Sequence, residues 1–308
     1  MFIMVNFNRE LYMKTLTVFT PTYNRAYCLD QCYQSLVRQT NQDFIWLIID
    51  DGSTDNTEEL VNSWMSEKKI EIQYHYQDNL GMHGGHNAAY RLIETELNVC
   101  IDSDDYMPDD AIALILSFWK KNGNDSYAGI VGLDGNKAGA ILGTTIPDTI
   151  KECTLIDLYE KHKVTGDKKL VYRTEIVKKY PEYPIFEGEK FVPLGYKYLL
   201  IDQDYKLLTL NEILCTVEYL PDGSSLNILK QYKRHPKGFA FSRISEMEYA
   251  PSFFYRFKKA IHYIANNLMA KNFNFIKESP KIATTILAIP FGILLYLFIH
   301  LKTYERTK

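Results

Sequence analysis

The stretch Phe44-Ile45-Trp46-Leu47-Ile48-Ile49-Asp50-Asp51-Gly52-Ser53 decides the fold, because six apolar residues end abruptly at two carboxylates and a glycine. An apolar run of this length, bounded by turn residues, predicts a strand that is buried on both faces. Ser53 or Thr54 is expected to cap a helix that extends to about Met65. A buried strand followed by a helix is the building unit of a parallel sheet.

The same unit recurs on both sides of this stretch. Further strands are predicted at 16–20, 70–76 and 98–101, and further helices at 28–39, 86–94 and 108–120. This alternation predicts an α/β fold with a mostly parallel, helix-covered sheet. Beyond residue 123 glycines and prolines interrupt the pattern, and we predict only a helix near 154–161 and a strand near 169–172.

Acidic clusters directly follow two of the predicted strands, as Asp50-Asp51 and as Asp102-Ser103-Asp104-Asp105. In parallel sheets ligands bind at the carboxyl ends of the strands, where both clusters fall. Two carboxylates one residue apart can reach a hard divalent cation and a ribose hydroxyl together, and such a cation neutralises a departing diphosphate. Taken alone, the pattern also occurs in acidic turns and helix caps.

Three blocks of sequence together resemble the family 2 glycosyltransferases of the bacterial cell-surface polysaccharide type, whose catalytic domain has the GT-A fold. The blocks are Thr20-Pro21-Thr22-Tyr23-Asn24-Arg25, Ile48 to Thr57, and Asp102-Ser103-Asp104-Asp105, in the family's order and spacing. Gly188-Glu189 and the stretch Tyr219-Leu220-Pro221-Asp222-Gly223-Ser224 resemble later family segments less tightly.

The resemblance implies roles for individual residues. Asp104 would hold Mn²⁺ or Mg²⁺, Asp102 would contact the ribose, and Asp51 would accept a hydrogen bond from a uracil-type ring. A carboxylate can accept the imide N–H of uracil, which cytosine does not offer. The glycines and amide of the loop 78–87 would approach the donor phosphates. The full set of predicted donor-binding residues is Thr20, Pro21, Tyr23, Arg25, Asp51, Asn87, Asp102 and Ser103.

The catalytic base is expected in Phe186-Glu187-Gly188-Glu189-Lys190. Inverting transfer needs a carboxylate that takes the proton of the acceptor hydroxyl. The family commonly has Glu-Asp at this place with Asp as the base, but here Lys190 stands where that Asp would be. Glu189 is therefore the first candidate and Glu187 the second, with an exposed acidic turn as the alternative and Asp202 or Asp204 next to consider.

The charge distribution divides the chain. Residues 1–227 hold 21 Lys and Arg against 34 Asp and Glu, whereas residues 228–281 hold 11 against 3. The next twenty residues, 282–301, carry no charge and match the thickness of a bilayer core. Pro290 and Gly292 interrupt this run, so a bent or re-entrant helix and a buried helix are alternatives to a span.

These observations predict four segments: an N-terminal extension (1–13), a GT-A catalytic domain (14–227), a basic amphipathic helical region (228–281) and an apolar membrane-associating segment (282–301). The five cysteines form no C-x-x-C pattern and are expected to be reduced thiols in the cytoplasm.

We expect an inverting, metal-dependent glycosyltransferase at the cytoplasmic face of the cell membrane. It would move a hexosyl group from a UDP-sugar to a hydroxyl of a glycan, with a polyprenyl-linked acceptor favoured by the tail. The alternative is a catalytically weak subunit that binds sugar nucleotides or glycans within an assembly complex. Nucleic acid is not an expected partner, because the basic tail ends in an apolar run.

Overall fold

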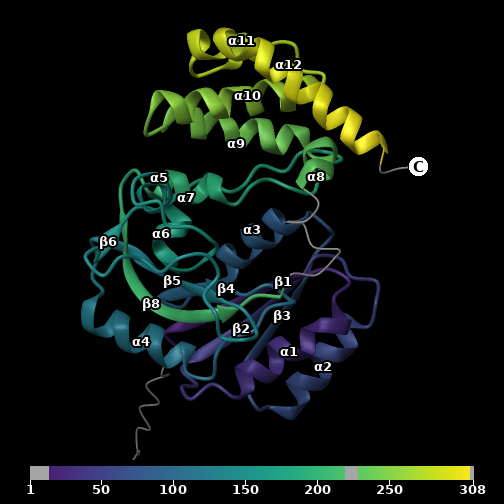
Figure 1. Cartoon of the computed structure of the whole chain (residues 1–308). Helices are drawn as coiled ribbons and strands as arrows, with labels where there is room; N and C mark the ends of the chain where they lie inside the picture. Colours follow the sequence, from purple (N-terminus) through teal and green to yellow (C-terminus); the bar gives the residue numbers. More distant parts are fainter. Residues whose placement is uncertain (1–13, 219–227, 306–308) are drawn as a thin grey trace, which may run out of the picture.

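The computed structural model describes residues 14–218 and 228–305, so the predicted extension over 1–13 and the 219–224 stretch lie outside it. Its elements are β1 (Leu16–Thr22), α1 (Ala26–Val37), β2 (Phe44–Asp50), α2 (Thr57–Glu67), β3 (Ile72–Tyr76), α3 (Met82–Leu92), β4 (Leu97–Cys100), α4 (Ala111–Asn122), β5 (Tyr127–Gly135), β6 (Glu152–Cys153), α5 (Leu155–Glu160), β7 (Lys168–Arg173), α6 (Thr174–Lys179), α7 (Gly195–Ile201), β8 (Lys206–Thr216), α8 (Ile228–Arg234), α9 (Pro236–Glu248), α10 (Phe253–Met269), α11 (Phe275–Glu278) and α12 (Ile282–Glu305) (Figure 1).

One sheet carries eight strands of the described chain, in the order β3-β2-β1-β4-β7-β5-β8-β6. The first four strands in the sequence are mutually parallel, and β5 is parallel to β8. β7 pairs antiparallel with both β4 and β5, so β5 and β8 point in the same direction as β4. Among these eight strands β6 and β7 therefore oppose the rest, and the predicted mostly parallel sheet is confirmed.

Helices cover both faces of the sheet (Figure 1), which explains why β2 is apolar at six consecutive positions rather than at alternate ones. Trp46 and Ile48 of β2 belong to the cluster beneath α1, α2 and α4. Leu47 and Ile49, which point to the opposite face, pack with α3 and the helices that follow β5. The strand that decides the fold is therefore buried on both sides, as predicted.

The register of the central strands fixes where the site forms. Thr22 at the end of β1 lies beside Asp50 at the end of β2. Phe19 pairs with Cys100 at the end of β4, so the acidic turn follows at the same edge. Asp51, Tyr23 and the acidic turn are thus adjacent because three parallel strands end together.

Two local predictions are wrong. α2 begins at Thr57, so neither Ser53 nor Thr54 caps it. Instead, the Asp55 carboxylate accepts hydrogen bonds from the Thr57 amide at 3.2 Å and from the Thr57 hydroxyl at 2.6 Å. α3 begins at Met82 rather than near 86, so Gly84 and Gly85 lie inside the helix. A Cβ on Gly85 would be 3.1 Å from Cβ of Pro21, so this glycine lets α3 approach the sheet instead of admitting a phosphate.

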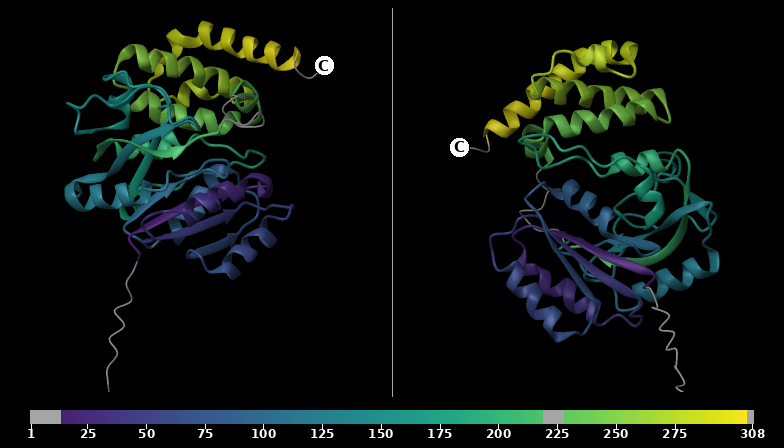
Figure 2. Two further views of the ribbon diagram at one scale, coloured as in Figure 1. Left: turned by 60° about the horizontal axis from the view of Figure 1, so that its bottom comes forward. Right: turned by 180° about the vertical axis from the view of Figure 1, so that it is seen from behind.

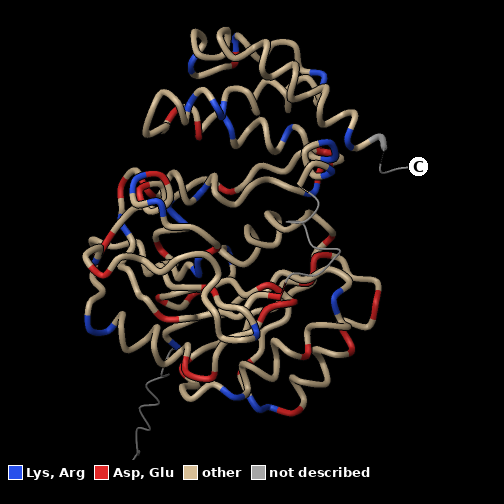
Figure 3. Tube along the Cα trace, in the orientation of Figure 1, with Lys and Arg blue, Asp and Glu red and all other residues tan. Residues whose placement is uncertain are grey.

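The helices after residue 227 form a separate layer (Figures 1 and 2). α9 packs on α7, α10 packs on α9, and α12 packs on α10, so α11 and α12 lie at the end of the molecule away from the sheet. A small core joins them, which includes Met247, Tyr263, Ile264 and Ala288. The predicted C-terminal helical region is confirmed, and Figure 3 shows Lys and Arg distributed along it.

Candidate active site

A cavity of about 690 Å³ opens at the edge of the sheet where β1, β2, β4 and β5 end. We call the side built by Pro21, Tyr23, Arg25, Asp51 and Asp102 to Asp105 the N-terminal wall. The opposite side, the C-terminal wall, includes Asp134, Tyr159, Lys169, Phe191, Tyr198 and Gln231. Seven predicted site residues line this cavity: Pro21, Tyr23, Arg25, Asp51, Asp102, Ser103 and Asp104.

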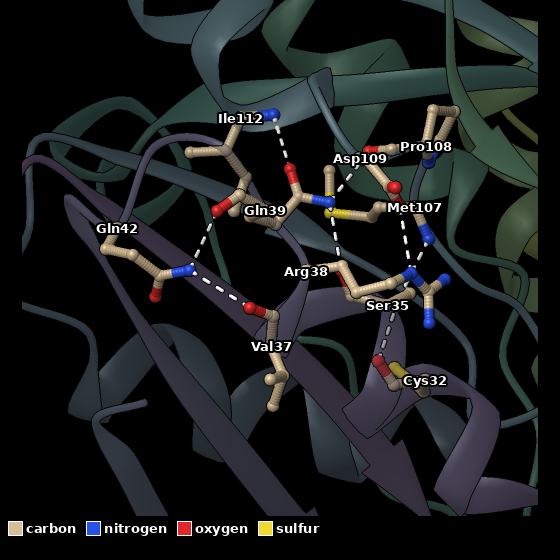
Figure 4. Close-up of polar contacts among 10 residues, drawn as sticks. All are labelled: Cys32, Ser35, Val37, Arg38, Gln39, Gln42, Met107, Pro108, Asp109 and Ile112. Carbon is tan, nitrogen blue, oxygen red and sulfur yellow. Dashed lines mark hydrogen bonds and ion pairs between the residues drawn. The ribbon is translucent and has the colours of Figure 1, made fainter. Parts of the chain in front are cut away.

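The segment that follows the acidic turn is held by Gln39, which lies just after α1 (Figure 4). The buried Gln39 amide donates to the Pro108 carbonyl at 2.7 Å and accepts from the Ile112 amide at 3.0 Å. Ser35 accepts from the Met107 amide at 3.2 Å, and Gln31 donates to the Asp104 carbonyl at 2.5 Å. These bonds fix the backbone at Asp104 and in the segment that follows the turn, which helps to hold the turn in one conformation before any ligand arrives.

Asp51 is almost fully buried and its carboxylate is already well ordered. It accepts hydrogen bonds from the Gln77 side chain at 2.6 Å, the Leu80 amide at 2.8 Å and the Gly81 amide at 2.7 Å. Burial raises the pKa of Asp51, while these donors and Lys190 oppose the shift. A carboxylate offers about four acceptor sites, so one remains for a ligand in the cavity.

Asp102 and Asp104 fit a divalent cation that the substrate helps to bind. No group of three or more His, Cys, Asp or Glu side chains in the described chain is arranged to hold a metal by itself. Mg²⁺ and similar cations are commonly bound by one or two carboxylates plus substrate phosphates. Asp102 is exposed to the cavity and Asp104 is half-buried beside it, which suits such a shared site.

A buried ion cluster connects the two walls. Lys169, at the start of β7, is held between Asp105 and Asp134, and its Nζ lies 3.8 Å from Asp134 Oδ1. The surrounding carboxylates and the Cys215 thiol outweigh desolvation and raise the pKa of Lys169 well above its usual range. Burial raises the pKa of Asp134, and Lys169 opposes the shift. The ammonium group of Lys169 therefore favours the ionised carboxylate of Asp134 on the C-terminal wall.

Three buried polar atoms on cavity-lining residues have no hydrogen-bond partner among the described residues: Thr22 Oγ1, His86 Nε2 and Asp134 Oδ1. Burial lowers the pKa of His86 to about 4, so its ring is neutral at pH 7. His86 Nδ1 lies 3.0 Å from the Met82 carbonyl, which places the proton there and leaves Nε2 as an acceptor. Buried polar atoms are rarely left without a hydrogen bond, so these three atoms are candidates for contact with a bound ligand.

Two predicted donor-binding residues lie elsewhere. The Thr20 hydroxyl is fully buried in the core and accepts from Trp46 Nε1 at 3.0 Å. The Asn87 amide bonds the backbone of Tyr183 in both directions, at 2.8 and 2.9 Å. Neither side chain is part of the cavity lining. Their contacts stabilise the fold around the site, because each satisfies buried polar groups that would otherwise be unpaired.

The predicted bases also lie outside the cavity lining. The Glu189 carboxylate is buried and accepts from the backbone amides of Lys237 at 2.9 Å and Gly238 at 2.9 Å, at the beginning of α9. Glu187 is exposed in the preceding turn. Lys190 donates from Nζ to the Asn79 carbonyl. This segment joins the catalytic domain to the C-terminal helices, and the base assignment stays a prediction.

Sequence reasoning missed the functional candidates Asp134, His86 and Lys169. A signal for Asp134 was present, because Asp134-Gly135 ends a mostly apolar strand, much as Asp51-Gly52 directly follows one. The glycines at 129 and 132 hid that strand. Gly129 has φ +150°, and a Cβ there would be 1.9 Å from the Val171 carbonyl, so the strand needs glycine at an irregularity.

A mostly parallel sheet whose fourth strand ends in a carboxylate pair, facing a cavity at the strand ends, defines the class as a GT-A glycosyltransferase. Residues 17–179 match the model of the family described as Glycosyl transferase family 2. The match spans more than half of the chain, which therefore belongs to this family.

Known proteins resemble the chain over different lengths. The poly(ribitol-phosphate) beta-glucosyltransferase of Bacillus spizizenii is 28% identical over 124 residues, which are 39% of this chain and 20% of that protein. The chain spans about a tenth to a quarter of the length of the curated relatives it matches.

Two solved structures share the fold. S. aureus TarS 1–349 in complex with UDP-GlcNAc has a TM-score of 0.61 at 17% identity, covering 91% of this chain and 80% of that one. The mannosyltransferase PcManGT from Pyrobaculum calidifontis, in complex with GDP-Man and Mn²⁺, has a TM-score of 0.54 at 14% identity, covering 92% and 86%.

Proposed function

We propose that this glycosyltransferase uses a UDP-sugar as its donor and Mn²⁺ or Mg²⁺ as its cofactor. One observation carries the proposal: Tyr23, Asp51, Asp102 and Asp104 converge on one cavity from three strand ends. Asp51 would accept a hydrogen bond from the imide N–H of uracil, with Tyr23 beside the base. Asp102 would accept a hydrogen bond from a ribose hydroxyl. A bound divalent cation at Asp104 would neutralise charge on the departing diphosphate.

The fold alone does not decide the nucleotide, because similar folds bind UDP-GlcNAc and GDP-Man. The uridine assignment depends on Asp51, whose remaining acceptor site suits an N–H donor. Guanine also offers N–H groups but is a larger, two-ring base. Comparing protection by UDP, CDP and GDP therefore tests the assignment directly, with and without Mn²⁺.

The proposed reaction is a single displacement with inversion at the anomeric carbon. β4 and β5 end at the same edge with β7 between them, so their ends are about two strand spacings, roughly 10 Å, apart. That distance leaves room for a sugar ring between the acidic turn and Asp134. The two carboxylate positions would then face opposite sides of the anomeric carbon, as inversion requires.

Two carboxylates compete for the role of base. The sequence favours Glu189, whose oxygens are occupied by two backbone amides. We favour Asp134, because it lines the cavity and one oxygen faces Lys169 without a hydrogen bond. Asp134 would take the proton of the acceptor hydroxyl as that oxygen attacks, while Lys169 holds the carboxylate in position.

The acceptor we propose is a glycan hydroxyl, carried on a polyprenyl lipid at the cytoplasmic face of the membrane. The resemblance to a poly(ribitol-phosphate) glucosyltransferase supports a role in cell-surface polysaccharide synthesis. Tyr159, Phe191 and Tyr198 line the C-terminal wall and offer flat apolar surfaces for sugar rings. One C-terminal helix is long and apolar enough to cross a membrane, which supports a lipid-linked acceptor.

The test combines donor turnover with product stereochemistry. UDP-glucose, UDP-galactose and their N-acetyl forms are incubated with Mn²⁺, and released UDP is measured. The proton coupling constant at the new anomeric centre then reports its configuration. Release of UDP with β-linked product from an α-linked donor supports the proposal, whereas retention of configuration or preference for GDP-mannose would overturn it.

A further inference from the structure

The large apolar side chains of α12 lie on its exposed face, and its buried face is mostly formed by small side chains. Its large apolar side chains face outward and are 42–64% exposed: Ile282, Ile286, Leu287, Phe291, Ile293, Leu294, Leu297, Phe298 and Leu301. Its buried positions are mostly small or hydroxylated: Thr284, Thr285, Ala288, Gly292, Ile299 and Thr303. A helix at the surface of a water-soluble protein buries its large apolar residues instead. Water is therefore not the medium that suits the outer face of α12.

The small residues let α12 pack closely against the rest of the protein. A Cβ on Gly292 would lie 2.6 Å from Cβ of Ile264 in α10, so only glycine permits this approach. The rings of Phe257 in α10 and Phe291 meet edge-on with their centroids 5.6 Å apart. Lys281 Nζ lies 3.0 Å from Oε1 of Glu248 in α9. α12 also packs on α8. These contacts hold it along the outside of the helical layer (Figure 2).

This packing is incompatible with α12 crossing a bilayer. α10 runs against α12 and carries Arg256, Lys258, Lys259 and His262. If α12 spanned the membrane, these groups would enter the hydrocarbon, where the three cationic side chains are costly to bury. An in-plane position avoids this cost, because the outer face of α12 enters the lipid while α10 stays on the aqueous side.

The charges around α12 match an anionic lipid surface. Residues 228–303 contain twelve Lys and Arg, the eleven of 228–281 plus Lys302, against three Glu. Two of those acids are already paired, Glu246 with Arg243 and Lys259, and Glu248 with Lys281. The exposed lysines at 258, 271 and 277 can face lipid headgroups. Each Lys or Arg near such a surface adds to the attraction.

The same helical layer reaches the active site. Ile228 and Gln231 of α8 line the cavity, and α8 packs on α12. Phe253 stacks on Phe257, which extends the apolar surface from α12 to the beginning of α10. A membrane at the outer face of α12 would therefore lie beside the cavity rather than on the far side of the molecule.

We propose that the outer face of α12 is a monotopic docking surface that lies in one leaflet of an anionic membrane without crossing it. This inference deepens the proposed function, because it sets how a lipid-linked acceptor would approach the cavity.

Vesicle binding tests the surface. Leu287→Glu and Leu294→Glu alter side chains that are 60% and 62% exposed, so the fold should survive. The full chain should sediment with vesicles of phosphatidylglycerol in phosphatidylcholine, and each substitution should weaken binding by about tenfold or more, since burying one such side chain contributes to that extent. Met65→Glu, at a 39% exposed position on α2, is the matched control and should bind like wild type.

Cysteine labelling tests the topology. Lys281→Cys and Lys302→Cys mark the two ends of α12, and wild type supplies the background from the native thiols. A membrane-impermeant maleimide added outside preformed vesicles should label both ends. Labelling of one end alone would show a span and overturn the inference, as would wild-type vesicle binding by the two Glu variants.

Self-association is a further outcome that would overturn the inference. If α12 covers a second copy, wild type would be a dimer that ignores vesicles, and Leu294→Glu would be a monomer. Metal-dependent hydrolysis of the donor, measured without lipid, separates this test from the proposed function. Hydrolysis should be equal in wild type and the Glu variants, whereas its absence in all of them would refute the donor assignment and leave vesicle binding unaffected.

Discussion

The two walls of the cavity are assembled in different ways. The N-terminal wall comes from residues 21–105, where short turns follow three adjacent parallel strands. The C-terminal wall gathers residues from β5, α5, β7, α7 and α8, which span residues 127–234 and include two strands of opposite direction. Short local motifs in the sequence encode the first wall, whereas the second wall forms only when segments that are far apart in the sequence pack together.

The walls also differ in how their charges are managed. Asp51 on the N-terminal wall is satisfied by backbone and amide donors from its own neighbourhood. Asp134 on the C-terminal wall depends on Lys169, contributed by another strand. We infer that the N-terminal wall recognises the constant part of the substrate, the nucleotide and diphosphate, and that the C-terminal wall carries the chemistry specific to the acceptor.

The largest effect is expected on the N-terminal wall. Asp104→Asn removes a charged oxygen ligand, and because a bound cation supplies several kcal/mol of charge stabilisation, transfer should fall by roughly 10³-fold or more. The thermal unfolding midpoint should stay near that of wild type. Asp110→Asn, at the exposed beginning of α4, is the control and should transfer at the wild-type rate. Full activity in excess EDTA would contradict the metal assignment.

The second effect concerns the C-terminal wall. Asp134→Asn keeps the shape and removes the basicity, so transfer should fall by about 10²–10⁴-fold while UDP binding stays unchanged. Glu189→Gln removes a charged partner of two backbone amides, so it should reduce the free energy of unfolding, by about 1–2 kcal/mol, rather than the rate.

Initial rates at saturating donor distinguish the two carboxylates, with the exposed Glu187→Gln as control. If Glu189→Gln is inactive but stably folded and Asp134→Asn turns over normally, the base lies at the junction with α9, as the sequence favoured. In that case the catalytic base would not be part of the C-terminal wall.

The contrast between the walls explains what the sequence could predict. Most strands and helices up to residue 122 were predictable because the strands are largely apolar and end at turn residues, as Phe44 to Asp51 shows. The meeting of Asp102 and Asp104 with Asp51 at one cavity followed from the parallel register, since adjacent strand ends meet. The Thr20 side chain was predicted to bind the donor but lies in the core. A motif identifies a block of residues, whereas the direction of each side chain along the strand decides which residue reaches the cavity.

The C-terminal wall could not be predicted from local patterns. β5 contains two interior glycines, and β8 alternates too irregularly to be recognised beside its bulged partner. Glu189 lies in the expected segment, but its role depends on α9, almost fifty residues later. Lys169 was visible as a strand residue, yet only the antiparallel insertion of β7 between β4 and β5 places it among carboxylates.

The third prediction concerns nucleotide choice. UDP should raise the unfolding midpoint of wild type more than CDP or GDP does, in the presence of Mn²⁺. Asp51→Asn should weaken UDP binding by about ten- to a hundredfold, because a hydrogen bond to a charged group contributes about 1.5–3 kcal/mol. CDP binding should change much less, since cytosine has no imide proton to donate. Stronger protection by GDP would refute the base-pocket assignment.

The smallest effect tests how α5, which carries Tyr159, is fixed to the C-terminal wall. Asp202 is buried and accepts from the Leu155 amide at 3.0 Å and the Ile156 amide at 2.9 Å. Burial raises the pKa of Asp202 to about 6, from an ordinary value of 3.8. The folded protein therefore binds this proton more tightly than the unfolded chain does, and the stability that depends on it is lost as the pH rises from about 4 to about 6.

Urea unfolding of wild type and Asp202→Asn at several pH values between 4 and 7 measures this contribution, because all other groups titrate alike in both. The stability of wild type relative to the variant should decline across the window, by at most about 1.4 kcal/mol per pH unit. The hydrogen bond that Asn cannot accept gives a constant offset without pH dependence. Turnover at pH 7 should be unchanged, since Asp202 caps α5 and lies outside the cavity lining. A flat difference would show that Asp202 is ionised throughout, and loss of turnover would return it to the candidates for the base.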